Sequence, residues 1–255
     1  MNRLFILALN TFREAVRDRV LYSILFFGVG VIILSIALEE VTIGDQAKVV
    51  RSVGQGAIDV FGSIIAMFLG VSLVWKELDK KTIYTILSKP IPRWMFILGK
   101  YAGLMLTLLV EVLILLTIYV GLMVVEQSFP PLVVFVSMWM LMMELTLLTA
   151  WATLFSSYSE PTTASAFTLA IFAIGHLADD IWLFGSKSDS PVVQQVAAGL
   201  YWMLPNFEVF NIREAAVHEL AIPWEQVIAG TGYGLSYTAV VLVLAILIFR
   251  SRDVK

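Results

Sequence analysis

The stretch ILGKYAGLMLTLLVEVLILLTIYVGLMVV, residues 97–125, decides the fold of this chain. It carries only two charged residues, Lys100 and Glu111. A helix needs about 20 mainly apolar residues to cross the hydrocarbon core of a bilayer. This stretch is longer than that, so the chain contains at least one membrane-spanning helix.

Five further windows are apolar enough to cross a membrane: roughly residues 20–38, 57–75, 131–155, 164–183 and 226–249. The whole chain is 59% hydrophobic and 15% charged, whereas soluble domains carry about 25% charged residues. So much apolar surface is better placed against lipid than in a water-soluble core. The sequence therefore predicts an all-α membrane protein with six transmembrane helices, in a single domain over residues 1–255.

The basic residues divide unevenly between the two sides that six spans define. Four Lys or Arg residues lie in residues 1–19, six in residues 76–100 and three in residues 250–255, thirteen of the 17 in the chain. Six spans place these three segments on one side, and the positive-inside rule makes that side cytoplasmic. We expect a multi-pass protein of the cytoplasmic (inner) membrane with both termini in the cytoplasm.

Residues 1–19 have the pattern of an amphipathic helix at the membrane interface. The expected apolar face consists of Leu4, Phe5, Ala8, Leu9, Phe12, Ala15 and Val16. The expected polar face consists of Arg3, Asn10, Arg13, Glu14 and Arg17. Such a helix lies in the headgroup layer of an anionic leaflet and contacts membrane lipids. A simple topological anchor is the alternative explanation.

The connection between the second and third spans, residues 76–96, lies within the densest basic cluster of the chain. This cluster, residues 76–100, has the sequence KELDKKTIYTILSKPIPRWMFILGK. We expect a short amphipathic helix over residues 77–88, which Pro90 and Pro92 end because proline breaks a helix. Its apolar side consists of Leu78, Ile83, Ile86 and Leu87. This segment is the expected contact for a cytoplasmic partner, and a plain interfacial loop is the alternative.

Two carboxylates, Glu111 and Glu144, lie near the middle of the third and fourth spans. A charged side chain at that depth costs about 2.5–3.5 kcal/mol on insertion scales. Each is therefore expected to face the bundle interior, a partner chain or a water cavity. They are candidates for the substrate pathway or for gating. The alternative is an interhelical hydrogen-bond anchor, with Ser137, Thr146 or Thr149 as the possible partners.

Two smaller patterns lie at the ends of spans. Gly99 and Gly103 form a G-x-x-x-G pattern, which allows two helix backbones to approach closely. His176, Asp179 and Asp180 have the spacing of one helix face, and we expect them to line a wet outer end of the fifth span rather than bind a metal.

The outer segment, residues 184–225, is expected to form short helices over residues 192–203 and 207–220. These helices are separated by a break at Leu204-Pro205-Asn206.

The chain lacks the motifs of common enzyme classes. It contains no G-x-x-x-x-G-K-[ST], no H-E-x-x-H and no G-x-S-x-G pattern, so it offers no P-loop, zincin or hydrolase nucleophile. With no Cys and two His, a dedicated metal site is not expected. We expect no catalytic residue, no cofactor and no nucleic-acid partner for this chain.

The 76–100 segment resembles a stretch of ABC-2-type transporter permeases, in which an acidic residue after the second span precedes Thr-x-x-x-x-Leu, a Pro, an Arg and a Gly-Lys. The matching positions are Glu77, Thr82, Leu87, Pro90, Arg93, Gly99 and Lys100. The chain departs from the family where Lys81 replaces the more frequent Gly, and where Pro92 replaces Ser. Leu204-Pro205-Asn206 and Phe210-Asn211 are also similar to the family's pattern before its last span. The nearest branch is the permeases grouped with multicopper-enzyme maturation exporters.

The resemblance implies a type V exporter-like fold in which two six-span permease subunits, identical or closely related, pair around a central pathway. A separate P-loop ATPase subunit, which binds ATP and Mg, docks below each one, and an accessory outer or periplasmic subunit fits the same plan. Residues 1–19 become the connecting helix, the helix after the second span becomes the coupling helix, and the outer short helices cap the pathway. The candidate coupling residues are Glu77, Leu78, Lys80, Lys81, Thr82, Ile83, Leu87, Pro90 and Arg93.

Two other functions compete with an ATP-driven exporter. A self-sufficient channel or ion-coupled carrier would use Glu111 and Glu144, although no broken-helix repeat is visible. An intramembrane enzyme would use His176, Asp179 and Asp180, although no known catalytic pattern supports it.

Overall fold

The computed structural model describes residues 3–41, 46–79, 92–125 and 129–251. Within these residues every regular element is helical. In chain order the elements are α1 (Arg3–Ala15), α2 (Arg19–Val41), α3 (Gln46–Asp79), α5 (Arg93–Val125), α6 (Leu132–Tyr158), α7 (Pro161–His176), α8 (Ala178–Ser186), α9 (Pro191–Met203), the 3₁₀ turn η1 (Glu208–Phe210), α10 (Arg213–Val217) and α11 (Trp224–Ser251). The predicted all-α class is confirmed.

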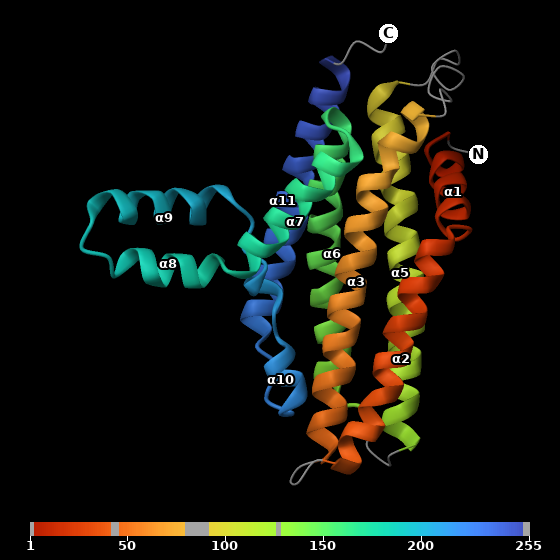
Figure 1. Cartoon of the computed structure of the whole chain (residues 1–255), viewed down its shortest axis with the longest axis vertical. Helices are drawn as coiled ribbons and strands as arrows, with labels where there is room; N and C mark the ends of the chain where they lie inside the picture. The colour runs from red at the N-terminus through yellow and green to blue at the C-terminus, as the bar shows by residue number, and fades with distance from the viewer. Residues whose placement is uncertain (1–2, 42–45, 80–91, 126–128, 252–255) are drawn as a thin grey trace.

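Five helices, namely α2, α3, α5, α6 and α11, are individually long and apolar enough to span a membrane, and the pair α7 and α8 makes a sixth if it is counted as one span. The start of α1, the end of α3, the start of α5 and the end of α11 all lie at one end of this bundle, as Figure 1 shows. The end of α2, the start of α3, the end of α5 and the start of α6 lie toward the opposite end, as does α10. Which side of the membrane each end faces stays a prediction.

The fifth span, predicted over roughly 164–183, is bent and is divided into α7 and α8. The chain bends by 58° between α7 and α8, and α8 and α9 form a hairpin that projects sideways from the bundle (Figure 1). The α7 helix has only 16 residues, so it is roughly 24 Å long, which is shorter than the bilayer core of about 30 Å. The hairpin therefore leaves the bundle between its two ends.

Packing against the later chain explains where α7 stops. A side chain at Gly175 would lie 2.4 Å from the ring of Phe207 and 2.9 Å from the carbonyl oxygen of Pro205. The Phe207 N–H also donates to the Gly175 carbonyl oxygen at 2.9 Å. The segment before η1 thus occupies the position that a continued straight helix would need.

The outer segment also differs from the prediction after its first helix. A helix over 192–203 is found as α9, but residues 207–220 form η1 and the short α10 instead of one helix. The side chains of Asn206 and Asn211 accept hydrogen bonds from the backbone N–H groups of Glu208 and Arg213. Such local side-chain bonds compete with helix formation, and they divide this stretch.

The N-terminal helix α1 packs along the first turns of α5, and it ends at Ala15, four residues earlier than expected. Its buried residues are Thr11 and Ala15, whereas Phe5 of the expected apolar face is 55% exposed. The face toward the bundle is therefore the one that carries small residues. The side that carries Phe5 is exposed, and its contact with lipid stays a prediction.

The second span is longer than the window 57–75 indicates, because α3 continues from Gln46 to Asp79. Glu77 and Leu78 therefore belong to the end of α3, not to a separate helix over residues 77–88. The remaining predicted coupling positions, Lys80, Lys81, Thr82, Ile83, Leu87 and Pro90, lie outside the described residues.

Candidate functional site

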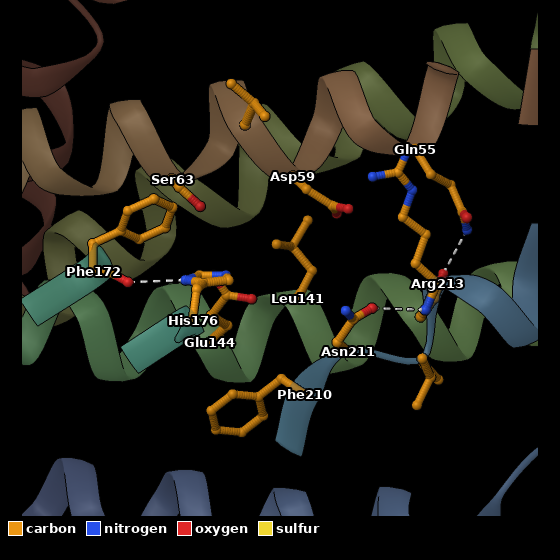
Figure 2. Close-up of a pocket in the computed structure, with 13 residues that line it drawn as sticks. Gln55, Asp59, Ser63, Leu141, Glu144, Phe172, His176, Phe210, Asn211 and Arg213 are labelled. Atoms are coloured by element: carbon orange, nitrogen blue, oxygen red, sulfur yellow. Dashed lines mark hydrogen bonds and ion pairs between the residues drawn. The ribbon is translucent and has the colours of Figure 1, made fainter. Parts of the chain in front are cut away.

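A polar cavity of about 270 Å³ lies within the bundle among α3, α6, α7 and the segment from η1 to α10 (Figure 2). Its walls come from four elements that are far apart in the sequence. The polar lining residues are Gln55, Asp59, Ser63, Ser137, Glu144, His176, Asn211 and Arg213. Because polar groups inside a membrane bundle are costly and usually functional, this cavity is the candidate site.

The Glu144 carboxyl group of α6 meets His176, the last residue of α7. The His176 Nδ1 atom lies 3.0 Å from the Phe172 carbonyl oxygen, and since a carbonyl only accepts, Nδ1 carries a hydrogen. The Nε2 atom lies 3.4 Å from Glu144 Oε1. The imidazole and the carboxyl group therefore face each other at one wall of the cavity.

The cavity wall between α3 and α6 is pinned by a hydrogen-bond chain. Gln55 Nε2 donates to Ser137 Oγ at 2.8 Å, and Ser137 Oγ donates to the Val134 carbonyl oxygen at 2.8 Å. Gln55 is 1% exposed. This chain fixes the spacing of the two helices on which Asp59 and Glu144 stand.

Asp59 and Ser63 both face the cavity and do not form a hydrogen bond with each other. Figure 2 shows both side chains on α3, directed toward the space above Glu144 and His176. Neither side chain makes a hydrogen bond with any residue that the structure describes, and Ser63 is 2% exposed. Their oxygens are therefore available as acceptors to whatever enters the cavity.

Arg213, the first residue of α10, crosses to α3 and closes the other end of the cavity. Its Nη2 atom donates to the Ser52 carbonyl oxygen at 2.6 Å and to Ser52 Oγ at 3.2 Å. A side chain at Gly56 would lie 2.7 Å from the same Nη2 atom, so the glycine makes room for the guanidinium. An ion pair between Arg51 and Glu219 also ties the outer segment to α3.

Asn206 connects two helices through its hydrogen bonds. In the sequence, only the family resemblance pointed to this residue. Its Nδ2 atom donates to Asp179 Oδ1 at 2.8 Å, and its backbone N–H donates to the Tyr233 hydroxyl oxygen at 3.0 Å. It thus links the start of α8 to α11. The expected common face of His176, Asp179 and Asp180 is wrong, because the bend at Leu177 sends His176 to Glu144 and Asp179 to Asn206.

Glu111 does not share the cavity with Glu144. It is 4% exposed, and neither carboxyl oxygen has a hydrogen-bond partner among the described residues. The expected anchors do not form either: Ser137 bonds to Val134, Thr146 bonds to Met142, and Thr149 Oγ1 has no partner within the described part of the chain. A pathway that uses both carboxylates together therefore has no support from this geometry.

The G-x-x-x-G pair lies under α1. A side chain at Gly99 would lie 2.7 Å from Leu7 Cβ, and one at Gly103 would lie 2.5 Å from the Ala8 carbonyl oxygen. The close approach therefore joins two helices of the same chain. Beside it, Lys100 Nζ lies 3.9 Å from Glu14 Oε2.

Arg93 connects the start of α5 to the end of α11. Its Nη1 atom donates to the carbonyl oxygens of Phe249 and Arg250, both at 3.0 Å. The Phe96 and Phe249 rings stack with centroids 5.7 Å apart. These contacts cap the C-terminus of α11, where the carbonyl groups lack helical partners. A contact of Arg93 with a partner protein remains a prediction.

The sequence contained a signal for the cavity that was missed. Gln55, Asp59 and Ser63 follow one another at intervals of four, so they lie on one face of an otherwise apolar helix.

Within the described part of the chain, no group of three or more His, Asp or Glu residues is arranged to hold a metal ion.

A bundle of long apolar helices defines a polytopic membrane protein. More specifically, the chain belongs to the ABC-2 family: the model described as ABC-2 family transporter protein matches residues 5–254. Proteins of this family are transmembrane permease subunits of ABC transporters, normally partnered by a P-loop ATPase subunit. No curated protein matches the chain.

Proposed function

We propose that this chain is the membrane-spanning subunit of an ATP-driven exporter in the cytoplasmic membrane, with both termini in the cytoplasm. Two copies, or one copy and a close homologue, pair to form the pathway. A separate P-loop ATPase docks on the segment that follows α3. The family match over residues 5–254 carries this proposal.

The contacts at the cytoplasmic end support a mechanical link between the docking segment and the spans. In the sequence, this segment lies between the end of α3 and the start of α5. Arg93, at the start of α5, holds the end of α11, and α1 lies against Gly99 and Gly103. A displacement of the segment is therefore transmitted to several helices at once, and it changes the relative stability of two arrangements of the bundle.

The test uses three apolar residues of the proposed docking site: Leu78 at the end of α3, and Ile83 and Leu87 in the segment that follows. The combined substitution Leu78→Asp, Ile83→Asp and Leu87→Asp is expected to abolish stimulation of the ATPase by the permease and to abolish transport, because these side chains can no longer bind in an apolar groove. Membrane insertion is expected to remain, because the spans are unchanged. Transport at the wild-type rate in this variant would contradict the docking assignment.

A matched control places the same charges elsewhere on the cytoplasmic side. Arg13→Asp and Arg17→Asp alter two residues of the N-terminal segment that the structure leaves exposed. These changes are expected to preserve ATPase stimulation. Equal loss in both variants would indicate a general effect of negative charge.

A further inference from the structure

The cavity contains two opposite charges that are not paired with each other. Asp59 on α3 and Arg213 on α10 both line it, yet they form no ion pair with each other or with any other described residue. Arg213 Nη2 is hydrogen-bonded to Ser52, and the Arg213 charge acts on Asp59 from a distance. The Asp59 oxygens accept no hydrogen bond from any described residue, so they are open to a ligand.

The other titratable groups in the cavity do not supply the missing partners. Glu144 Oε1 and His176 Nε2 lie 3.4 Å apart, so each of these groups already has the other as its neighbour. Glu208 lies in the adjoining η1 turn and accepts from Asn211 Nδ2 at 3.0 Å. Charges of both signs thus line one cavity, and a ligand that carries both signs fits it better than a lone cation or a lone anion.

We propose that this cavity binds a zwitterion whose ammonium group lies at Asp59 and whose anionic group lies at Arg213. Ser63 Oγ and Glu144 Oε2 are further acceptors toward the ammonium end. Phe172 and Phe210 also line the cavity, and their rings offer apolar and cation–π contacts to a protonated amine. As a substrate class this inference rests on the proposed function, whereas the binding itself does not.

A lined volume of about 270 Å³ lies at the lower end of the range of small-molecule sites. It suits a small amine with a carboxylate or phosphate group, or the headgroup of a lipid of that type. The two sources share the same chemistry, so the experiment has to separate them.

The first measurement is calorimetric titration of the purified full chain in detergent with phosphoethanolamine. Ethanolamine and methyl phosphate, which each carry one of the two charged groups, serve as half-ligands. Binding of phosphoethanolamine is expected to be roughly ten- to a hundred-fold tighter than binding of either half, the range given by one charge-assisted hydrogen bond. No heat with phosphoethanolamine, or equal affinity for one half alone, would overturn the proposal.

The affinities of single-residue variants for phosphoethanolamine test whether the ligand binds in this cavity. Asp59→Asn and Arg213→Gln are each expected to weaken binding by a similar factor, and Ser63→Ala by a smaller one. The control variants Glu111→Gln and Lys187→Gln change a buried carboxylate and a cation outside the cavity, so they are expected to bind as wild type does. If Asp59→Asn or Arg213→Gln fails to fold, Ser63→Ala and the half-ligands decide, and unchanged affinity in Ser63→Ala would then count against the site.

Binding measurements in nanodiscs distinguish a lipid headgroup from a free zwitterion as the natural ligand. If the natural ligand is a headgroup, discs that contain phosphatidylethanolamine will suppress binding of soluble phosphoethanolamine, and discs of phosphatidylglycerol will not. Equal binding in both discs would assign the site to a free zwitterion. Absence of binding while an ATPase still co-purifies would reject this inference and leave the proposed function intact.

Discussion

Glu111 and Glu144 lie in neighbouring spans and are both buried, but their surroundings differ. Glu144 contacts His176 and faces the cavity. Glu111 has no hydrogen-bond partner among the described residues, and a buried polar group without a partner is destabilising. The depth of a carboxylate in a span thus predicts the free-energy cost of its burial. Only the structure shows that the two glutamates have different surroundings.

Replacing the two glutamates by methionine is expected to have opposite effects on stability. Glu111→Met removes an unsatisfied group at similar volume, so the free energy of unfolding is expected to rise by about 1–3 kcal/mol. Glu144→Met leaves His176 without its partner and is expected to lower that free energy. Thermal unfolding in detergent measures both. A loss in Glu111→Met as large as in Glu144→Met would show that Glu111 has a partner outside the described residues.

At the scale of elements, α1 and α5 meet through a backbone contact at Gly103, where an added side chain would lie 2.5 Å from the Ala8 carbonyl oxygen and 2.6 Å from Thr11 Cβ. Backbone atoms cannot rotate away as the end of a long side chain can. The same helix offers a control, because nothing lies within 4 Å of an added side chain at Gly121.

Gly103→Ala is therefore expected to loosen α1 and to cost about 1–3 kcal/mol, the usual range for overpacking. Gly121→Ala is expected to leave stability unchanged or to raise it by up to about 1 kcal/mol, because alanine favours a helix over glycine. Protease accessibility of residues 3–15 and thermal unfolding report the two effects. Equal behaviour of both variants would mean that α1 is not held at Gly103.

The end of α11 depends on Arg93. Arg93→Gln is expected to increase hydrogen exchange over Ile248–Ser251 a few-fold, since a cation at a helix C-terminus contributes about 0.3–1 kcal/mol. Arg13→Gln on the exposed side of α1 is the matched control. Unchanged exchange in Arg93→Gln would exclude a capping role for this residue.

Hydropathy predicted the spans because bilayer thickness alone sets their length, and it located α2, α5, α6 and α11 within a few residues. It missed the α8–α9 hairpin because the bend after His176 comes from Phe207 packing on Gly175, a contact between segments far apart in the sequence. The cavity was missed for the same reason, since Arg213 reaches α3 only in the folded chain. Gln55, Asp59 and Ser63 were visible as a stripe, but their partners were not.

At the scale of the whole molecule, both described ends of the chain lie at the same end of the bundle as the borders of residues 80–91, as Figure 1 shows. The outer segment is tied to α3 at the other end through Arg213 and Glu219. Long helices such as α3, with 34 residues, connect the two ends. Helix α3 thus connects the proposed ATPase contact to the polar cavity.

The central claim is that this chain works with a separate ATPase. The most direct measurement is purification of the tagged chain from its native membrane in mild detergent, followed by mass spectrometry of the proteins that accompany it. The account predicts a stoichiometric P-loop ATPase. If none co-purifies under conditions that keep other ABC complexes intact, the claim is contradicted, and a carrier that works through Glu144 without ATP becomes the better description.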